Sequence, residues 1–265
     1  MKTLALAFAL AAAVPATAAD LAAVKARGTL RVIVMPLSAT DEFFPVPPGA
    51  RPGFDRAVLD GFVGLHRITL EVVPVEGWDN LIPALLQGRG DLIAGRFTVT
   101  DARLKQIAFT NEVFPSRNIV MTRKPHAPVA TLEALRQEKV GTIKGSSMAE
   151  AVHAVVPAPN VDDSFPPGGL PGALVSGKVS AVVLGVESAI AAQRQDAEME
   201  LGVFVGPPRS LAYGVRKQDT ALLQALNEYI DNLRRTPTWS RLVVEYFGDA
   251  APEILRKARA TEAAR

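Results

Sequence analysis

The segment "GWDNLIPALLQGRGDLIAGRFTVTDARLKQIAF", Gly77 to Phe109, decides the fold. Its first part has the apolar spacing of a helix that Gly88 ends, and "DLIAG" after it is a short apolar run typical of a buried strand. The same alternation precedes it, as a strand "TLRVIVMP", a helix "FDRAVLDGFVGLH" and a strand "ITLEVVPV". Strands that alternate with helices indicate parallel βαβ units, so the sequence predicts an α/β fold.

A second run of strands and helices follows from "SRNIVMTRK" to "LGVFVGP". After it come a strand "RSLAYGVRK" and two amphipathic helices, which begin at Asp219 and at Thr236-Pro237 and need the first run as their partner surface. We therefore expect lobe 1 to comprise residues 19–115 and 209–265, and lobe 2 residues 116–208. The chain would cross near Val113 to Asn118 and near Pro208 to Tyr213, which makes a hinge and a ligand cleft between the lobes.

The two ends of the chain carry different signals. Residues 1–18 read as a secretory signal, with an apolar run from Leu4 to Val14 and a small-x-small site at Ala16-Thr17-Ala18. The tail after Pro252, "EILRKARATEAAR", could form a short basic helix, but we expect a frayed, solvated terminus.

Composition excludes several classes of function. The sequence has no cysteine, which rules out disulfides, zinc thiolates and the acylated cysteine of a lipoprotein anchor. We therefore expect a free periplasmic protein. Its basic residues are scattered and its formal net charge is +2, so no nucleic-acid partner is expected. No cofactor or metal site is expected either.

Anion-seeking groups gather directly after the strand "DLIAG", where Arg96, Thr98, Thr100 and Arg103 follow within a few residues. Thr100-Asp101 is typical of the cap and first turn of a short helix, "DARLKQI". A cation in the first turn opposes the helix dipole, so we expect Arg103 to point off the helix toward an anion. Its guanidinium, the Thr98 hydroxyl and backbone N–H groups would form a carboxylate cradle. A surface arginine paired with Asp101 is the alternative.

Four blocks carry a resemblance to a known family. They are "GFD" (Gly53 to Asp55), the segment Gly77 to Thr110, "KVGTIKGSS" (Lys139 to Ser147) and the segment Tyr213 to Gly248. Together they resemble family 3 bacterial solute-binding proteins, the polar-amino-acid-type receptors of ABC importers. The resemblance implies a two-lobed type II periplasmic-binding-protein fold and an ABC permease in the inner membrane as partner. We expect a monomer that binds a small-molecule carboxylate.

The resemblance also implies roles for individual residues. Arg103 and Thr98 would hold the ligand carboxylate, and Trp78 would form an aromatic wall unless it packs in the core. Phe43 or Phe44 would form another wall, with one of the two expected to touch ligand.

Two serines of the second lobe would present hydroxyls and helix N-terminal amides to the ligand. Ser147 stands three residues before Glu150, which satisfies a capping box and would use the Ser147 hydroxyl internally. Ser146 is then expected to be the ligand donor.

Two departures from the family pattern bear on the ligand. Arg96 stands where such receptors usually have a small residue whose carbonyl accepts from the ligand ammonium, and Gly185 stands where an aspartate usually pairs with it. Both changes act against a bound ammonium. Glu187 could compensate, or could be a first-turn glutamate favoured by the helix dipole. We therefore expect an organic anion or an amino acid with a blocked or absent amine, and Arg96 would suit a second anionic group.

Two other functions remain open at this stage. Some similar proteins are cyclohexadienyl dehydratases, in which a carboxyl group after the corresponding second-lobe strand acts as general acid. Glu187 could serve so, although Ser188 aligns better with that acid. A non-transport accessory protein with a degenerate cleft is the second alternative. We rank a receptor above both.

Overall fold

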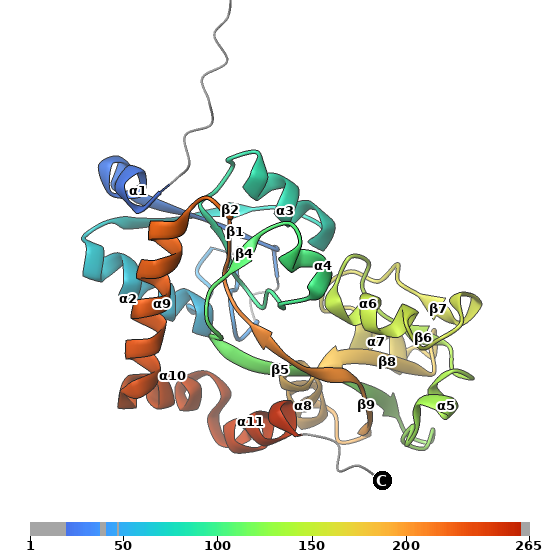
Figure 1. The fold of residues 1–265 in the computed structure, drawn as a ribbon. Helices are drawn as coiled ribbons and strands as arrows, with labels where there is room; N and C mark the ends of the chain where they lie inside the picture. Colours follow the sequence, from blue (N-terminus) through green and yellow to red (C-terminus); the bar gives the residue numbers. More distant parts are fainter. Residues whose placement is uncertain (1–19, 38–40, 47, 261–265) are drawn as a thin grey trace, which may run out of the picture.

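A computed structural model describes residues 20–37, 41–46 and 48–260 (Figure 1). The predicted signal segment, residues 1–18, lies outside the described residues. The chain forms two lobes, each built on a five-stranded sheet. The strand order across the first sheet is β2 (Thr69–Pro74), β1 (Thr29–Val34), β3 (Leu92–Ile93), β10 (Gly214–Val215) and β4 (Ala108–Phe109). Across the second sheet it is β7 (Val161–Asp162), β6 (Val140–Gly141), β8 (Ala181–Gly185), β5 (Phe114–Arg123) and β9 (Met199–Leu211). The predicted α/β class and the two lobes are confirmed.

The first sheet and its helices come from both ends of the chain. Its strand β1 (Thr29–Val34) lies between two parallel neighbours, β2 and β3, and consists mainly of fully buried apolar residues. The elements around this sheet are α1 (Leu21–Arg27), β1 (Thr29–Val34), α2 (Phe54–His66), β2 (Thr69–Pro74), α3 (Trp78–Leu86), β3 (Leu92–Ile93), α4 (Asp101–Leu104), β4 (Ala108–Phe109), β10 (Gly214–Val215), α9 (Thr220–Arg235), α10 (Pro237–Phe247) and η2 (Gly248–Ala250).

The second sheet is made by the middle of the chain. Two of its strands, β5 and β9, are long and antiparallel, and β9 passes through Pro207 and Pro208 as one strand where the sequence suggested two. Both prolines are exposed on this edge strand, a position that tolerates the missing N–H. The elements are β5 (Phe114–Arg123), α5 (Leu132–Leu135), β6 (Val140–Gly141), α6 (Ser147–His153), η1 (Ala158–Asn160), β7 (Val161–Asp162), α7 (Leu170–Val175), β8 (Ala181–Gly185), α8 (Val186–Gln195) and β9 (Met199–Leu211).

The chain passes between the two sheets twice, as expected. One passage connects β4 to β5, and the other connects β9 to β10. The first passage lies slightly before its predicted position, Val113 to Asn118. The two passages are hydrogen-bonded to each other, from the Thr110 N–H to the Tyr213 carbonyl and from the Val113 N–H to the Leu211 carbonyl, both at 2.9 Å. A double connection of this kind allows the lobes to move about a common hinge while keeping their register.

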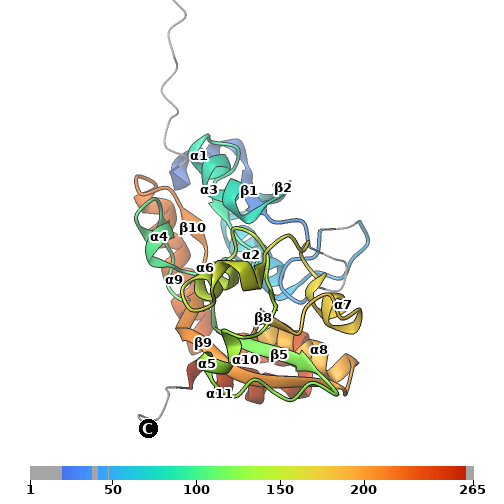
Figure 2. The same ribbon diagram turned by 90° about the vertical axis from the view of Figure 1, so that its right-hand side faces the viewer.

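The C-terminal tail differs from its prediction. Residues 251–259 form a helix, α11 (Ala251–Arg259), that buries Ala251, Ile254 and Ala258. It packs against β5, α8 and β9, and lies beneath these long strands in two perpendicular views (Figure 1, Figure 2). The expectation of a frayed terminus was wrong here because a stripe of two alanines and one isoleucine gives a weak apolar signal.

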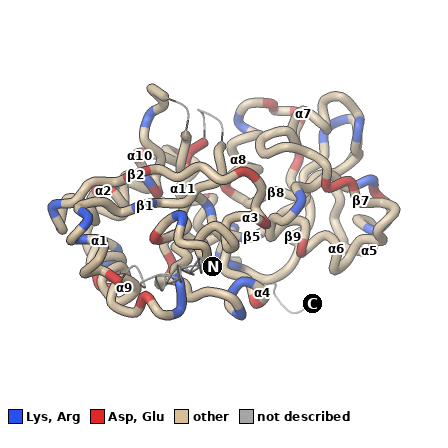
Figure 3. The backbone as a smooth tube through the Cα atoms, turned by 90° about the horizontal axis from the view of Figure 1, so that it is seen from above, with Lys and Arg blue, Asp and Glu red and all other residues tan. Residues whose placement is uncertain are grey.

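Charges of both signs are interspersed along both lobes (Figure 3). Within the described part of the chain, no helix has the length and apolarity needed to cross a membrane.

Candidate functional site

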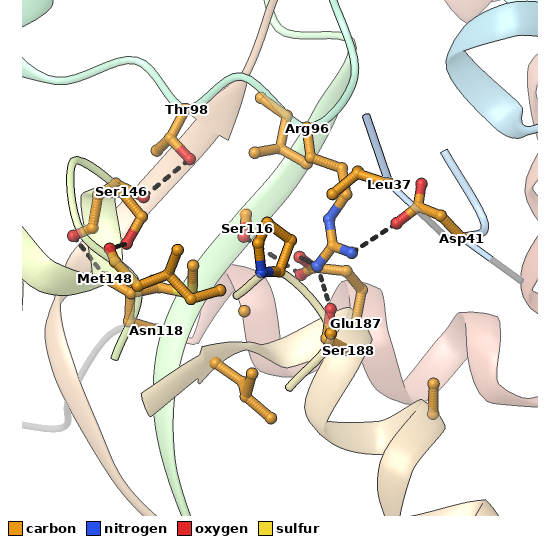
Figure 4. Close-up of a pocket in the computed structure, with 18 of the residues that line it drawn as sticks. Leu37, Asp41, Arg96, Thr98, Ser116, Asn118, Ser146, Met148, Glu187 and Ser188 are labelled. Atoms are coloured by element: carbon orange, nitrogen blue, oxygen red, sulfur yellow. Dashed lines mark hydrogen bonds and ion pairs between the residues drawn. The ribbon is translucent and has the colours of Figure 1, made fainter. Parts of the chain in front are cut away.

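A cavity of about 200 Å³ lies between the lobes and receives side chains from both (Figure 4). Eight of the residues predicted for the site line it: Trp78, Arg96, Thr98, Arg103, Ser146, Ser147, Gly185 and Glu187.

Arg103 reaches the cavity from α4, the short helix that Thr100 caps through its hydroxyl. Its guanidinium donates to the carbonyls of Thr98 at 2.8 Å and Gly145 at 3.3 Å, and it lies 4.1 Å from the Phe97 ring centroid. Among the described residues no carboxylate forms an ion pair with it. Burial lowers the pKa of Arg103 to about 10, with Glu150 and Asp79 opposing the effect from a distance. The side chain is therefore a buried cation whose contacts are to neutral groups.

The carbonyl of Gly145 brings the second lobe against this arginine. A Cβ atom at Gly145 would lie 2.3 Å from Oδ1 of Asp79 on α3, so the loop before α6 can approach the first lobe this closely because it carries glycine.

The two serines have exchanged their expected roles. Ser146 caps α6, accepting from the Ala149 N–H at 3.1 Å and donating to the Ile143 carbonyl at 2.6 Å. Ser147 donates its hydroxyl across the cleft to the Thr98 hydroxyl at 3.0 Å. The helix begins one residue earlier than the capping box suggested, so the prediction that Ser147 is the cap was wrong.

Trp78 lines the cavity at the start of α3 and is 8% exposed. Trp78 therefore both lines the cavity and packs in the core. The sequence left these two positions open as alternatives, and the structure shows both. The Trp78 indole Nε1 has no hydrogen-bond partner within the described residues.

Phe43 and Phe44 do not line the cavity, and both are at most 2% exposed. Phe43 packs in an aromatic cluster, with ring centroids 6.0 Å from Phe54, 5.4 Å from Phe114 and 5.2 Å from Phe247. The expectation that one of the two phenylalanines forms a cleft wall is not met, because their loop turns inward toward the core of lobe 1.

The residues just before these phenylalanines line the cavity instead. Asp41 and Glu42 face it, and Asp41 Oδ1 accepts the N–H groups of Phe43 and Phe44 at 2.9 and 2.8 Å. Burial raises the pKa of Glu42, against the attraction of Arg96. Sequence reasoning missed both carboxylates, although an acidic pair in a loop that follows a buried strand was a usable signal.

Arg96 is paired rather than free. Its guanidinium contacts Asp41 Oδ2 at 2.9 Å and Glu187 Oε1 at 3.1 Å, and it also bonds to the Ser188 hydroxyl (Figure 4). Burial works against its charge, but Asp41 and Glu187 outweigh burial and raise the pKa of Arg96. The suggestion that Arg96 suits a second anionic group of the ligand loses its basis, since the side chain is already matched by two carboxylates.

Glu187 occupies the space beside Gly185. A Cβ atom at Gly185 would lie 2.2 Å from Glu187 Oε1, and Glu187 Oε2 accepts from the Ser116 hydroxyl at 3.2 Å. The carboxylate thus turns into the cleft from the first turn of α8. Glu187, two residues after Gly185, supplies a negative charge at this place, and it forms an ion pair with Arg96.

A buried carboxylate holds the turn that carries Arg96. Gly95 and Arg96 both have positive φ, +82° and +61°, and direct their N–H groups to Asp55 Oδ2 at 3.1 and 3.0 Å. Tyr213 Oη lies 3.3 Å from Asp55 Oδ1, and burial raises the pKa of Asp55 to about 6. Asp55 belongs to the "GFD" block that contributed to the resemblance.

Comparison with known proteins identifies the family of this chain. Residues 37–249 match the family described as bacterial extracellular solute-binding proteins, family 3. The chain belongs to this family. A histidine-binding periplasmic protein of Escherichia coli strain K12 is 24% identical over 83% of this chain and 95% of its own length. A probable histidine-binding protein of Campylobacter jejuni is 31% identical over 39% of this chain and 40% of its own length.

Solved structures agree on the fold. A mutant of ArgBP from T. maritima superposes with a TM-score of 0.74 and 25% identity, covering 86% of this chain and 99% of that one. The predicted two-lobed periplasmic-binding-protein fold is therefore confirmed.

An enzyme and a binding protein related to an enzyme are also among the similar proteins. A membrane-bound lytic murein transglycosylase F of Desulfosudis oleivorans is 23% identical over 74% of this chain, which spans 44% of that protein's length. An ancestral amino acid-binding protein, AncCDT-1, described as a precursor of cyclohexadienyl dehydratase, has a TM-score of 0.74 and 24% identity over 85% of this chain and 98% of its own. At that identity the likeness concerns the fold alone.

Proposed function

We propose that this chain is the periplasmic substrate-binding component of an ABC-type importer. It encloses one small carboxylate-bearing solute, an organic anion or a modified amino acid, in the cleft between its lobes. It acts as a monomer, leaves the cytoplasm through the signal at residues 1–18, and delivers the solute to a permease in the inner membrane.

Arg103 carries this proposal. It is 9% exposed and lines the cavity, and its guanidinium donates hydrogen bonds to carbonyl oxygens. Carbonyls satisfy N–H donors but leave the charge unmatched, and an unmatched buried cation is costly. A carboxylate that enters the cavity would supply the missing charge and could form a bidentate pair.

Polar groups from both lobes surround that position. Thr98 comes from lobe 1, Ser147 from α6, and Ser116 and Asn118 from β5. A solute held by Arg103 could contact hydroxyl and amide groups on both sides of the hinge. Such contacts exist only when the lobes are closed, which is how a solute would shift the hinge equilibrium.

A thermal-unfolding screen of organic acids and α-amino acids tests the proposal. A solute at about one hundred times its dissociation constant should stabilise the wild type by about 2.7 kcal/mol. That stabilisation corresponds to a rise in the unfolding temperature of roughly 5–10 °C for a chain of this size. Histidine belongs in the screen because relatives are named for it.

Variants of one arginine make the screen specific. Arg103→Ala should abolish the shift, and Arg103→Lys should retain part of it, because an ammonium keeps the charge but cannot form the bidentate pair. Arg89→Ala, which removes an exposed arginine of lobe 1, should leave it unchanged. Full shifts in Arg103→Ala would refute the carboxylate assignment.

An enzyme on the same scaffold is the second candidate, favoured by the transglycosylase and the dehydratase precursor among the similar proteins. Both carboxylate oxygens of Glu187 are engaged, one by Arg96 and one by Ser116, which favours an ion-paired role over a general acid. Nuclear magnetic resonance of the stabilising solute decides between the two. A receptor returns the solute unchanged, whereas an enzyme converts it, and an accessory protein with a degenerate cleft produces no shift at all.

A further inference from the structure

The contacts of Arg96 link the two lobes. Its Nη1 atom meets Asp41, from the loop after β1, and its Nη2 atom meets Glu187 and Ser188, from the start of α8 (Figure 4). One guanidinium therefore joins acceptors that belong to opposite sides of the cleft.

Each of these acceptors is fixed by its own lobe. Asp41 uses its second oxygen to accept two backbone N–H groups of its own loop, and Glu187 uses its second oxygen to accept the Ser116 hydroxyl. The side chains of Asp41 and Glu187 are 5% and 4% exposed. Two buried carboxylates held in place by other groups, and facing each other across a gap, form a site for a cation.

The side chain that fills this site comes from an unusual backbone position. Arg96 has φ of +61°, a conformation that residues other than glycine rarely adopt, and Asp55 holds it there through the backbone N–H. The Arg96 guanidinium also lies 5.4 Å from the centroid of the buried Phe43 ring. The side chain is thus directed into the cleft by the core of lobe 1.

We propose that Asp41 and Glu187 form a cation site that the chain fills with its own Arg96. The guanidinium has two effects. It holds the lobes together before a solute arrives, and it keeps the ammonium or guanidinium group of a solute away from the two carboxylates. The second effect rests on the proposed function. The Arg96 guanidinium would determine which carboxylate-bearing solutes enter the cleft, namely those without a cationic group.

The surroundings of the Arg96 site agree with an uncharged solute body. Apolar residues line the same cavity as well, namely Leu37, Pro167, Pro171, Leu184, Ala191 and Ala192. A solute anchored at Arg103 would meet this apolar lining with the end that carries no charge.

Chemical rescue of Arg96→Gly tests the cation site. Glycine fits the positive φ and leaves the two carboxylates unpaired, so the variant should unfold at a lower temperature than the wild type. Methylguanidinium chloride at millimolar concentration, compared with sodium chloride at equal ionic strength, should restore stability in a saturable way. At about ten times its dissociation constant the expected rise is about 3–6 °C.

Two controls make the rescue specific. The wild type and Arg89→Gly should show no rise, and Arg96→Gly combined with Glu187→Gln should lose most of the rise because one carboxylate is gone. Equal shifts in all four proteins, or none in Arg96→Gly, would overturn the proposal.

A distance measurement covers the case in which Arg96→Gly does not fold. The sequence has no cysteine, so spin labels can be placed at Gln87→Cys in lobe 1 and Lys178→Cys in lobe 2, both exposed. The unliganded protein with Arg96 intact should give one short distance. Arg96→Met, whose side chain has no charge and no N–H donor for either carboxylate, should shift the population to longer distances.

Unchanged distances in Arg96→Met would refute the link between the lobes. Neither the rescue nor the distance measurement needs a solute. A negative result in these two experiments would therefore not refute the proposed solute binding at Arg103. A negative result in the Arg103 screen would likewise not refute the proposed role of Arg96.

Discussion

The carboxylate of Asp55 accepts the backbone N–H of Arg96 at 3.0 Å, so a buried acid of lobe 1 sets the turn from which Arg96 reaches lobe 2. Burial raises the pKa of Asp55 from 3.8 to about 6, although two N–H groups and the Tyr213 hydroxyl favour its charged form. The folded state therefore holds this proton at pH values where the unfolded chain has released it.

This relationship predicts a pH dependence of stability. Between about pH 4 and pH 6 the folded protein binds more protons at Asp55 than the unfolded chain does, so this group makes stability fall as pH rises. The full contribution at pH 7 is a cost of about 3 kcal/mol. Asp55→Asn should remove that slope and be at least as stable as the wild type at pH 7. Urea unfolding of both proteins from pH 4 to 8 measures it, and parallel curves would contradict the prediction.

The two adjacent serines should respond differently to substitution, because Ser146 caps a helix and Ser147 contacts the opposite side of the cleft. Ser146→Ala removes the cap of α6 and should cost about 1 kcal/mol, or about 2–4 °C in unfolding temperature. Ser147→Ala removes a contact across the cleft and should change stability by no more than about 0.5 kcal/mol. Thermal unfolding of both variants checks this, and a larger loss in Ser147→Ala would restore the capping box that the sequence suggested.

The architecture could be predicted well from the sequence, because a regular spacing of apolar residues over a long segment indicates which face of that segment is buried. The stripe of α9, with Leu222, Leu226 and Ile230 buried, and the apolar strand β1 follow from spacing alone. Helix starts are less certain, since Ser146 and Ser147 stand side by side and either could cap the helix. The direction of a loop is not encoded by any period, so Phe43 and Phe44 could not be assigned to core or cleft.

The charge pattern of the cleft was the hardest part to predict. Arg96 meets Asp41 and Glu187, which are 55 and 91 residues away along the chain. The sequence shows that Arg96 and Gly185 differ from the family pattern, but two separate departures do not reveal that Glu187 compensates for both. That compensation depends on the closeness of Gly185 to Glu187, which only the fold establishes.

Phe43 should behave as a core residue when it is changed. It is fully buried among Phe54, Phe114 and Phe247, so Phe43→Ala should cost about 3–5 kcal/mol. Phe43→Leu keeps part of the apolar volume and should cost less than Phe43→Ala. Urea unfolding measures both values. A cleft wall would give the opposite result, namely unchanged stability and a changed response to solutes.

The C-terminal helix should contribute to stability although it resembles a solvated tail in sequence. Ile254 is 2% exposed on the face of α11 that packs against β5, α8 and β9, so Ile254→Ala should destabilise the protein by about 2–4 kcal/mol. Arg256→Ala, at an exposed position of the same helix, should have an effect within about 0.5 kcal/mol. Because α11 follows the helices of lobe 1 and contacts the long strands of the second sheet, its loss should also loosen the hinge. Hydrogen exchange of β5 and β9 in Ile254→Ala tests that second effect: faster exchange in both strands is expected, and unchanged exchange together with unchanged stability would show that the tail is merely solvated.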